Sequence, residues 1–375
     1  MADTIKCPNC SANLVFDADT QKLVCDFCGA SFLPDELTFI PEETKDHPEE
    51  TKKEEQKAEE VPEASPEETS SKETAPEISS DEYSQFVCNA CGAAVITDKT
   101  TSASFCAFCG SPALIGQRLT NEFRPRYMIP FAYGREKAVE KFYGWCKGGR
   151  FTPISFVSDK NIEKLTGLYV PFWLFDIDGK MDYSGTGVDV NVVTTGSKTV
   201  TTTKYYDVKR KGTLHWRKIP LDAETKIDDK LMEAIEPFNY KGLRDYDFKY
   251  IPGFFADTYD LKAEDLNQRI VNRAMGYMNE EFKSSTKEYD RVTGVNNSSS
   301  FSEPKAELAL LPVWFLSYKY LGKTYHFAMN GQSGEVAGVP PVSMVKRTIL
   351  FAVLLAVLTV ITKIIVGLML GGYVG

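Results

Sequence analysis

Apolar residues recur between positions 119 and 340 with the spacings of helices and strands. In REKAVEKFYGWCK (135–147) they share one helical face, and the glycines at 148 and 149 predict where this helix ends. A second amphipathic helix is predicted in AEDLNQRIVNRAMGYMNEEF (263–282). Its apolar stripe, at a spacing of four, consists of Leu266, Ile270, Ala274, Met278 and Phe282.

Strand patterns accompany these helices. YVPFWLFDIDG (169–179) is typical of a buried strand followed by a turn. Residues 188–216 are rich in Val and Thr with turn signals between them, which predicts antiparallel hairpins. YHFAMNGQSGEVAG contains a strand, a turn at Asn330 and Gly331, and a second strand. Strands grouped with interspersed helices predict an α+β fold with a mainly antiparallel β middle domain.

Three apolar segments resemble one another: YVPFWLF from Tyr169, YIPGFFA from Tyr250 and LLPVWFL from Leu310. The first and third share an aliphatic-Pro-x-Trp core, and Gly-Lys follows both at a short distance. This likeness suggests an internal duplication of a strand–turn unit.

The longest apolar run lies at the C-terminal end. Residues 349–370 would form a helix about 33 Å long, enough to span the hydrocarbon core of a bilayer. Lys363 is the single charge within it, and its long side chain can reach the far headgroups. Lys346 and Arg347 adjoin the near end, so the positive-inside rule places the preceding residues in the cytoplasm. We therefore expect a tail-anchored, single-pass protein of the cell membrane.

Charge is distributed unevenly. The formal net charge is −9, but residues 41–82 hold 16 Asp or Glu and 5 Lys, a net of −11, which leaves the rest of the chain at +2. This stretch has no aromatic residue and too few large aliphatic ones to bury a core, so it is expected to be a disordered acidic linker. Residues 1–40 would then lie on a flexible tether that moves them freely relative to the body.

Eight of the nine cysteines repeat the spacing C-x2-C-x14-C-x2-C, at 7–28 (the first cysteine frame) and at 88–109 (the second cysteine frame). No secretory signal is visible at the N-terminus, so paired C-x2-C motifs indicate metal sites rather than disulfides. Each frame matches a zinc ribbon, in which a hairpin brings two cysteine turns together. Four thiolates close the coordination shell, which predicts two structural Zn²⁺ ions. The expected ligands are Cys7, Cys10, Cys25 and Cys28 in the first frame, and Cys88, Cys91, Cys106 and Cys109 in the second.

The sequence shows no constellation of catalytic residues. His47 lies in the acidic linker, His215 and His326 lie in predicted strands, and H-E-x-x-H, Walker A and G-x-S-x-G motifs are missing. Cys146 lies on the apolar face of a predicted helix, which favours a core residue over a reactive thiol. We therefore predict that the chain is not an enzyme.

These patterns divide the chain into five parts. They are the first zinc ribbon (1–40), the linker (41–82), the second zinc ribbon (83–118), an α+β cytoplasmic domain (119–340) and a juxtamembrane segment with a transmembrane helix (341–375).

A family resemblance rests on the two cysteine frames, the apolar tail and four segments between them. The segments are LTGLYVPFWLFD (165–176), IPLDAE (219–224), YIPGFFADTYD (250–260) and LPVWFLSYKYLGKTYHFAMNGQSGEVAG (311–338). The chain resembles bacterial TFIIB-type zinc-ribbon-containing, C-terminally membrane-anchored proteins over most of its length outside the linker. Some members of that group are linked to phage-shock protein A and to SPFH proteins in envelope stress. The resemblance implies a membrane adaptor with such cytosolic or membrane proteins as partners.

Three functions compete. A membrane-anchored adaptor or scaffold that recruits cytosolic proteins is favoured over a membrane-tethered nucleic-acid-binding protein, and an enzyme comes third. Zinc ribbons often bind nucleic acid, but residues 5–40 carry two lysines against five acidic residues and so have no basic stripe for phosphates. Phe27 and Phe108 lie within the cysteine turns, where local packing is a simpler explanation than stacking on bases.

Overall fold

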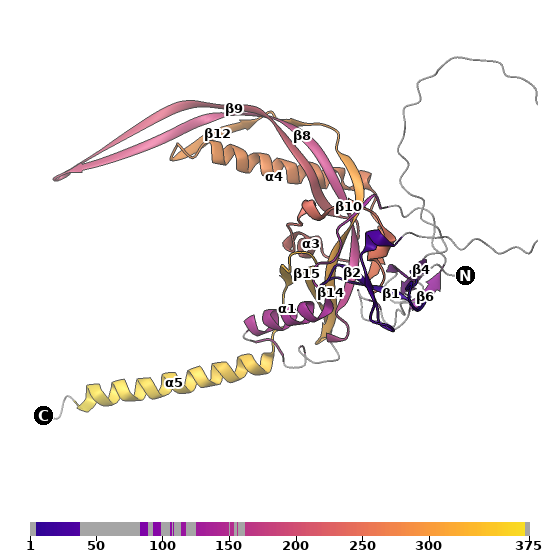
Figure 1. Cartoon of the computed structure of the whole chain (residues 1–375). Helices are drawn as coiled ribbons and strands as arrows, with labels where there is room; N and C mark the ends of the chain where they lie inside the picture. Colours follow the sequence, from indigo (N-terminus) through magenta and orange to yellow (C-terminus); the bar gives the residue numbers. More distant parts are fainter. Residues whose placement is uncertain are drawn as a thin grey trace, which may run out of the picture.

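The computed structural model describes residues 5–37, 83–88, 93–98, 106, 108, 114–117, 125–149, 151–153, 156 and 162–371. The predicted acidic linker and part of the second cysteine frame lie outside these residues. Within them the chain has an α+β fold with a large, mainly antiparallel sheet, few helices and one apolar C-terminal helix (Figure 1).

The strands form two sheets. The small one has the order β1-β2-β3, and the large one follows the path β10-β7-β14-β8-β11-β5-β4-β6, with β9, β12 and β13 also paired to β8, and β15 and β16 extending from β14. The strand bounds are β1 Leu14–Asp17, β2 Lys22–Cys25, β3 Ser31–Phe32, β4 Tyr83–Cys88, β5 Ala94–Asp98, β6 Leu114–Gln117, β7 Tyr127–Met128, β8 Thr166–Thr195, β9 Lys198–Asp222, β10 Arg244–Asp245, β11 Phe255–Asp257, β12 Arg291–Asn297, β13 Ser300–Phe301, β14 Lys305–Tyr320, β15 Lys323–Asn330 and β16 Val336–Gly338.

The helices confirm both predicted amphipathic patterns. Gly149 caps the end of the first, and all five residues of the predicted stripe in the second are buried. The α-helices are α1 Arg135–Gly148, α3 Asp229–Ala234, α4 Asn267–Ser285 and α5 Met344–Gly371. Short 3-10 turns are η1 Pro34–Glu36, η3 Tyr240–Gly242, η4 Phe248–Tyr250 and η5 Ala263–Leu266.

The similar segments from Tyr169 and Leu310 are neighbours at the centre of the large sheet. They belong to β8 and β14, which pair antiparallel with Pro171 opposite Leu310. This register is compatible with a local two-fold axis between the two strands. The end of the similar segment from Tyr250 belongs to β11, which pairs parallel with the other side of β8. The three segments therefore build the middle of one sheet.

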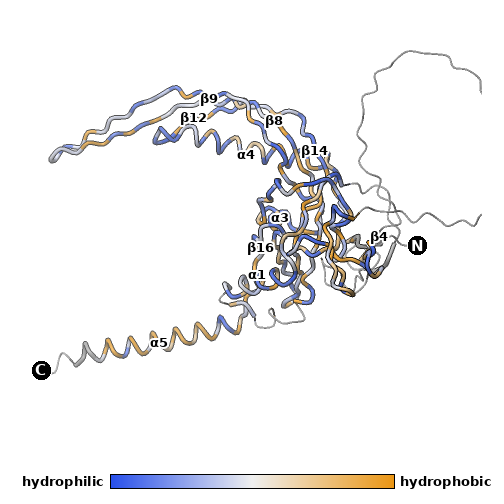
Figure 2. The backbone as a smooth tube through the Cα atoms, in the orientation of Figure 1, coloured by the Kyte–Doolittle hydropathy of each residue, from blue (hydrophilic) through white to orange (hydrophobic). Residues whose placement is uncertain are grey.

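β8 and β9 continue beyond the body as a long curved hairpin, which we call the arm (Figure 1). Several hairpins were expected here, but the strands form one, with its turn between Thr195 and Lys198. α4 lies along one face of the arm, and its Met278 and Phe282 share a buried cluster with Met181, Tyr183 and Val208 on the strands. Figure 2 shows residues of mixed polarity along the arm and mainly hydrophobic residues along α5.

Candidate metal centre

The first cysteine frame gathers its four thiols at one end of the small sheet. β1 and β2 form the hairpin between its two cysteine turns. The four Sγ atoms lie within 4.8 Å of one another, with Cys7 and Cys28 3.6 Å apart and Cys10 and Cys25 3.5 Å apart. A tetrahedral site with metal–sulfur bonds of about 2.3 Å places its sulfurs about 3.8 Å apart. The group is therefore positioned to bind a metal ion.

The two turns of this frame have the same backbone geometry. The N–H of Cys7 donates to the carbonyl of Ala12 (2.7 Å), and the N–H of Cys25 donates to that of Ala30 (2.9 Å). The residue that follows the second cysteine of each turn is left-handed, with φ of 59° at position 11 and 72° at position 29. Glycine adopts this conformation without strain, which accounts for its presence at position 29.

The electrostatics of the four thiols favour a bound cation. The backbone N–H of Cys28 lowers the pKa of Cys25 to about 7 against the effect of burial. The backbone N–H of Ala12 acts in the same direction on Cys10, but burial and the neighbouring sulfurs raise the pKa of Cys10 to about 12. The Cys25 thiolate therefore forms near neutral pH, whereas ionising Cys10 there requires the charge of a metal ion.

The second cysteine frame repeats the turn where it is described. The N–H of Cys88 donates to the carbonyl of Ala93 (2.8 Å), the same offset as in the first frame. Cys88 and Cys106 are fully buried, whereas Cys91 and Cys109 lie outside the described residues. The second metal site therefore remains a prediction.

The first cysteine frame is held against the body, which corrects the expectation that it moves freely on a tether. Asp19, in the turn between β1 and β2, accepts a hydrogen bond from the N–H of Gly134 (3.0 Å) and forms an ion pair with Lys137 of α1 (2.8 Å). Gln21 donates to the carbonyl of Phe131 (2.7 Å). The turn is thus fixed to the start of α1 by polar contacts.

Apolar contacts complete this interface. The ring of Phe16 lies edge-on to Tyr250, with centroids 5.0 Å apart, and the Phe16 N–H donates to the carbonyl of Pro252 (3.0 Å). Buried residues of the frame belong to the same hydrophobic cluster as Tyr169 and Trp314 of the large sheet. The spacing of the cysteines could not predict that the first frame docks on the body, because the docking contacts come from the hairpin between the two cysteine turns.

Each frame has a Phe directly before its last cysteine, but the two rings lie in different surroundings. Phe27 is 82% exposed, whereas Phe108 is 4% exposed and packs against Phe315 of β14, with centroids 5.9 Å apart. The expectation of local packing is therefore wrong for Phe27. Phe108 is packed, but against the large sheet.

α5 is long and apolar enough to cross a membrane, and none of its apolar span is buried against the body. Its start is attached through the N–H of Ser343, which donates to the carbonyl of Phe151 (2.7 Å), and through Lys346, which donates to that of Thr152 (2.7 Å). A helix with this composition and no cover is unfavourable in water, which supports a membrane anchor.

Glu224 and Asp257 are two fully buried carboxyls that the sequence patterns did not reveal as a pair. One oxygen of Glu224 accepts from Lys226 (2.8 Å) and one of Asp257 from the N–H of Thr258 (2.9 Å). The other oxygen of each has no donor among the described residues. Burial raises the pKa of both carboxyls, and the charge of Glu224 raises the pKa of Asp257 further.

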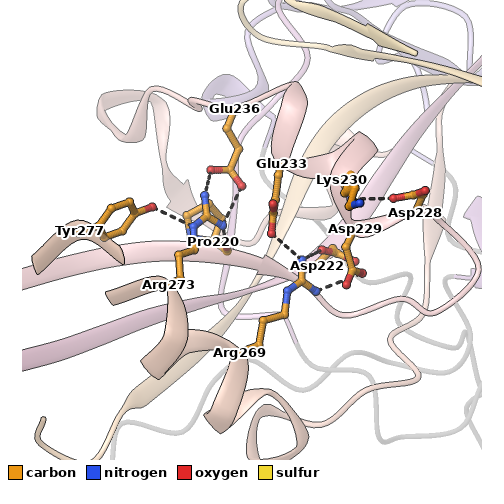
Figure 3. Close-up of polar contacts among 10 residues, drawn as sticks. All are labelled: Pro220, Asp222, Asp228, Asp229, Lys230, Glu233, Glu236, Arg269, Arg273 and Tyr277. Atoms are coloured by element: carbon orange, nitrogen blue, oxygen red, sulfur yellow. Dashed lines mark hydrogen bonds and ion pairs between the residues drawn. The ribbon is translucent and has the colours of Figure 1, made fainter. Parts of the chain in front are cut away.

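A second polar network joins α4 to α3 and to the end of β9 (Figure 3). Arg269 has three carboxylate partners: Asp222 (2.9 Å), Asp229 (3.1 Å) and Glu233 (3.1 Å). One turn further along α4, Arg273 pairs with Glu236 and donates to the carbonyl of Pro220 (2.8 Å). Since α4 also supports the arm, these contacts fix the angle between the arm and the body.

The other cysteine and the two histidines in the described residues do not form a reactive site with one another. Cys146 is buried in α1, as expected, and burial raises its pKa to about 12. Burial lowers the pKa of His326, and His215 lies on the arm 2.8 Å from Asp178. Across the described ranges, the first cysteine frame is the only group of three or more Cys, His, Asp or Glu positioned to hold a metal ion.

Comparison with known proteins shows a relative that matches almost the whole chain. The chain is 32% identical over 372 residues, 99% of each sequence, to a Bacillus subtilis (strain 168) protein described as uncharacterized protein YdjG. No family model and no solved structure matches the chain. The similarity spans both cysteine frames, the body and the apolar tail.

Proposed function

We propose that this chain, which belongs to the same family as YdjG of Bacillus subtilis, is a membrane-anchored adaptor that recruits protein partners to the membrane surface. The observation that carries the proposal is the exposed ring of Phe27 on a cysteine turn. The turn is rigid when metal is bound, and the hairpin behind it is fixed to the body. A large aromatic ring on a rigid support is typical of the anchors that dominate protein interfaces.

The metal is Zn²⁺, with one ion in each cysteine frame. Four thiolates with no carboxylate or imidazole in the group favour zinc in a closed, structural site. Elemental analysis of the purified, reduced chain should give close to two zinc ions per chain. A ratio near zero, or disulfides within the frames in cells, would end this assignment.

The anchor is α5, and the part before Lys346 is cytoplasmic. Lys346 and Arg347 adjoin the apolar span on the side of the body, in agreement with the positive-inside rule. The full chain should therefore need detergent for extraction, and truncation after Ser343 should give a soluble protein. A full-length chain that fractionates without detergent would show that α5 is not an anchor.

The surroundings of Phe27 favour a protein over a nucleic acid as partner. Asp26, Asp35 and Glu36 lie in the same small module, and its lysines are Lys6 and Lys22. Phosphates would be repelled there, whereas a partner with an apolar pocket and a basic rim would fit. The family resemblance favours phage-shock protein A-like or SPFH proteins as such partners.

Affinity capture of the full chain from gently solubilised membranes tests the adaptor function. Phe27→Ala should lose the captured partner while its zinc content stays unchanged. Leu321→Ala is the matched control, since Leu321 is a large apolar residue 75% exposed in the turn between β14 and β15. Retention of every partner by Phe27→Ala would contradict the proposal, and salt-dependent binding of DNA or RNA would favour the nucleic-acid function instead.

A further inference from the structure

The outer end of the arm, residues 190–203, is almost uncovered by the described part of the chain, and we call it the arm tip. Nearer the body, α4 covers one face, and β12 pairs with the outer edge of β8 from Tyr183 to Val188. The N–H of Val190 still donates to Asp290, next to β12 (2.6 Å), and beyond it the two strands continue alone (Figure 1). Within the described part of the chain, both faces and both edges of the hairpin are therefore open from Asn191 to Thr202.

The arm tip is rich in β-branched residues and has almost no charge, a composition that favours strand pairing. Ten of its 14 residues are Val or Thr, and Lys198 is its single charge. Val193 lies opposite Val200, and both are more than half exposed, at 54% and 60%. β-Branched residues favour strands, yet a two-stranded ribbon alone is only marginally stable in water. The tip therefore gains stability from a further strand.

Near the body, charged residues protect the β9 edge of the arm against pairing with another strand, and at the tip these charges are missing. From Lys204 to Lys218, β9 carries six Lys or Arg against one acidic residue, Asp207. Such a basic edge repels a second copy of itself, which is how proteins commonly prevent edge-to-edge association. This protection is absent from residues 199 to 203 of the same strand, so the tip is the part of the β9 edge that is open to pairing.

We propose that the arm tip pairs edge to edge with the arm tip of a second copy of this chain, antiparallel across a two-fold axis. Its nearly neutral Val and Thr edges can pair with themselves, whereas a strongly charged partner would find no counter-charge there. A bilayer is a poor occupant, because the tip has no Trp, Phe or Leu with which to enter it. Anchoring through α5, a part of the proposed function on which this inference rests, also holds all copies in one plane and raises their effective concentration.

Photo-crosslinking in membranes tests the pairing directly. A photoreactive amino acid replaces Val193 in the full chain, and in a matched control it replaces Val295, an exposed valine of β12 near the base of the arm. Irradiation should give a covalent dimer from position 193 and not from position 295. Adducts only to lipid or to another protein, no adduct, or equal dimer from both positions would overturn the proposal.

Adding a charge to the strand edge tests whether a dimer forms through the arm tip or through another surface. Thr201→Lys should reduce the dimer formed from position 193 by about ten-fold, whereas Thr213→Lys, on the edge already rich in lysine, should leave it unchanged. Mass measurement of the purified chain in detergent, at micromolar concentration, repeats the comparison without a membrane. A dimer that Thr201→Lys abolishes supports pairing even if α5 proves not to be an anchor, and a monomer or an unaffected dimer overturns it.

Discussion

The two cysteine frames share one sequence pattern and are used in different ways. The first forms a small sheet of its own, docks through Asp19 and Phe16, and leaves Phe27 in solvent. The second contributes β4 and β5 to the large sheet and buries Phe108 against β14. The cysteine turns therefore fix the local fold of each frame, whereas residues outside the turns decide whether a frame becomes a surface module or part of the core.

The largest difference is expected when one cysteine of each frame is removed. Cys88→Ser should lower the free energy of unfolding of the body by more than about 4 kcal/mol, because Cys88 is fully buried at the end of β4 in the large sheet. Cys7→Ser should unfold the first frame and lower the free energy of unfolding of the body less, by about 1–2 kcal/mol, because the body loses only the docking contacts of that frame. Tryptophan fluorescence during denaturant unfolding measures this, since all four Trp lie between positions 145 and 314. Equal losses from both variants would mean that the frames are equivalent.

The next largest difference in stability is expected between variants that remove the ring of Phe108 and variants that remove the ring of Phe27. Phe108→Ala should cost about 3–5 kcal/mol, the usual result of deleting a buried ring, whereas Phe27→Ala should stay within about 0.5 kcal/mol. Denaturant midpoints of the two variants, with zinc content measured alongside, provide the comparison. A loss of more than about 2 kcal/mol for Phe27→Ala would show that this ring stabilises the fold rather than serving a partner.

Attachment of the second frame should weaken as pH rises. β11 joins β5 to β8, and burial in β11 raises the pKa of Asp257 well above its unfolded value of about 3.9. Between these two values the folded chain holds a proton that the unfolded chain has lost, so stability falls with increasing pH. Asp257→Asn should remove part of this slope in unfolding experiments from pH 5 to 8, and Glu224, whose pKa burial also raises, contributes to the remainder. An unchanged slope would assign it to other groups.

The first frame should show a smaller effect of the opposite sign. Lys137 and then the N–H of Gly134 lower the pKa of Asp19, so the contact contributes stability above about pH 4 and loses it as pH falls further. Asp19→Asn should speed amide exchange in β1 and β2 about two- to five-fold at pH 6, as expected for a partly exposed ion pair. Asp26→Asn, at the exposed cysteine turn, is the control and should leave exchange unchanged.

Local patterns predicted local structure well. The stripe from Leu266 to Phe282 and the stop after Gly148 depend on neighbours in sequence, and both are confirmed. The four-cysteine group follows from spacing in the same way. The opposite positions of Phe27 and Phe108 could not be predicted, because their local sequences are nearly the same and distant strands decide their burial. The pairing of Glu224 with Asp257 likewise depends on the position of β11 in the large sheet.

The strand pairing of the large sheet also implies an order in which its parts fold during synthesis. β8 meets β9 after a tight turn, but the strand along its opposite edge at the body is β14, where Thr166 lies opposite Phe315, 149 residues later (315 − 166). Local hairpins form early, whereas contacts so distant in sequence wait for synthesis and for slow loop closure. The arm can therefore fold on the ribosome before the sheet from which it extends. α5 follows β14 closely, so the centre of the sheet closes at the stage of synthesis at which the anchor emerges.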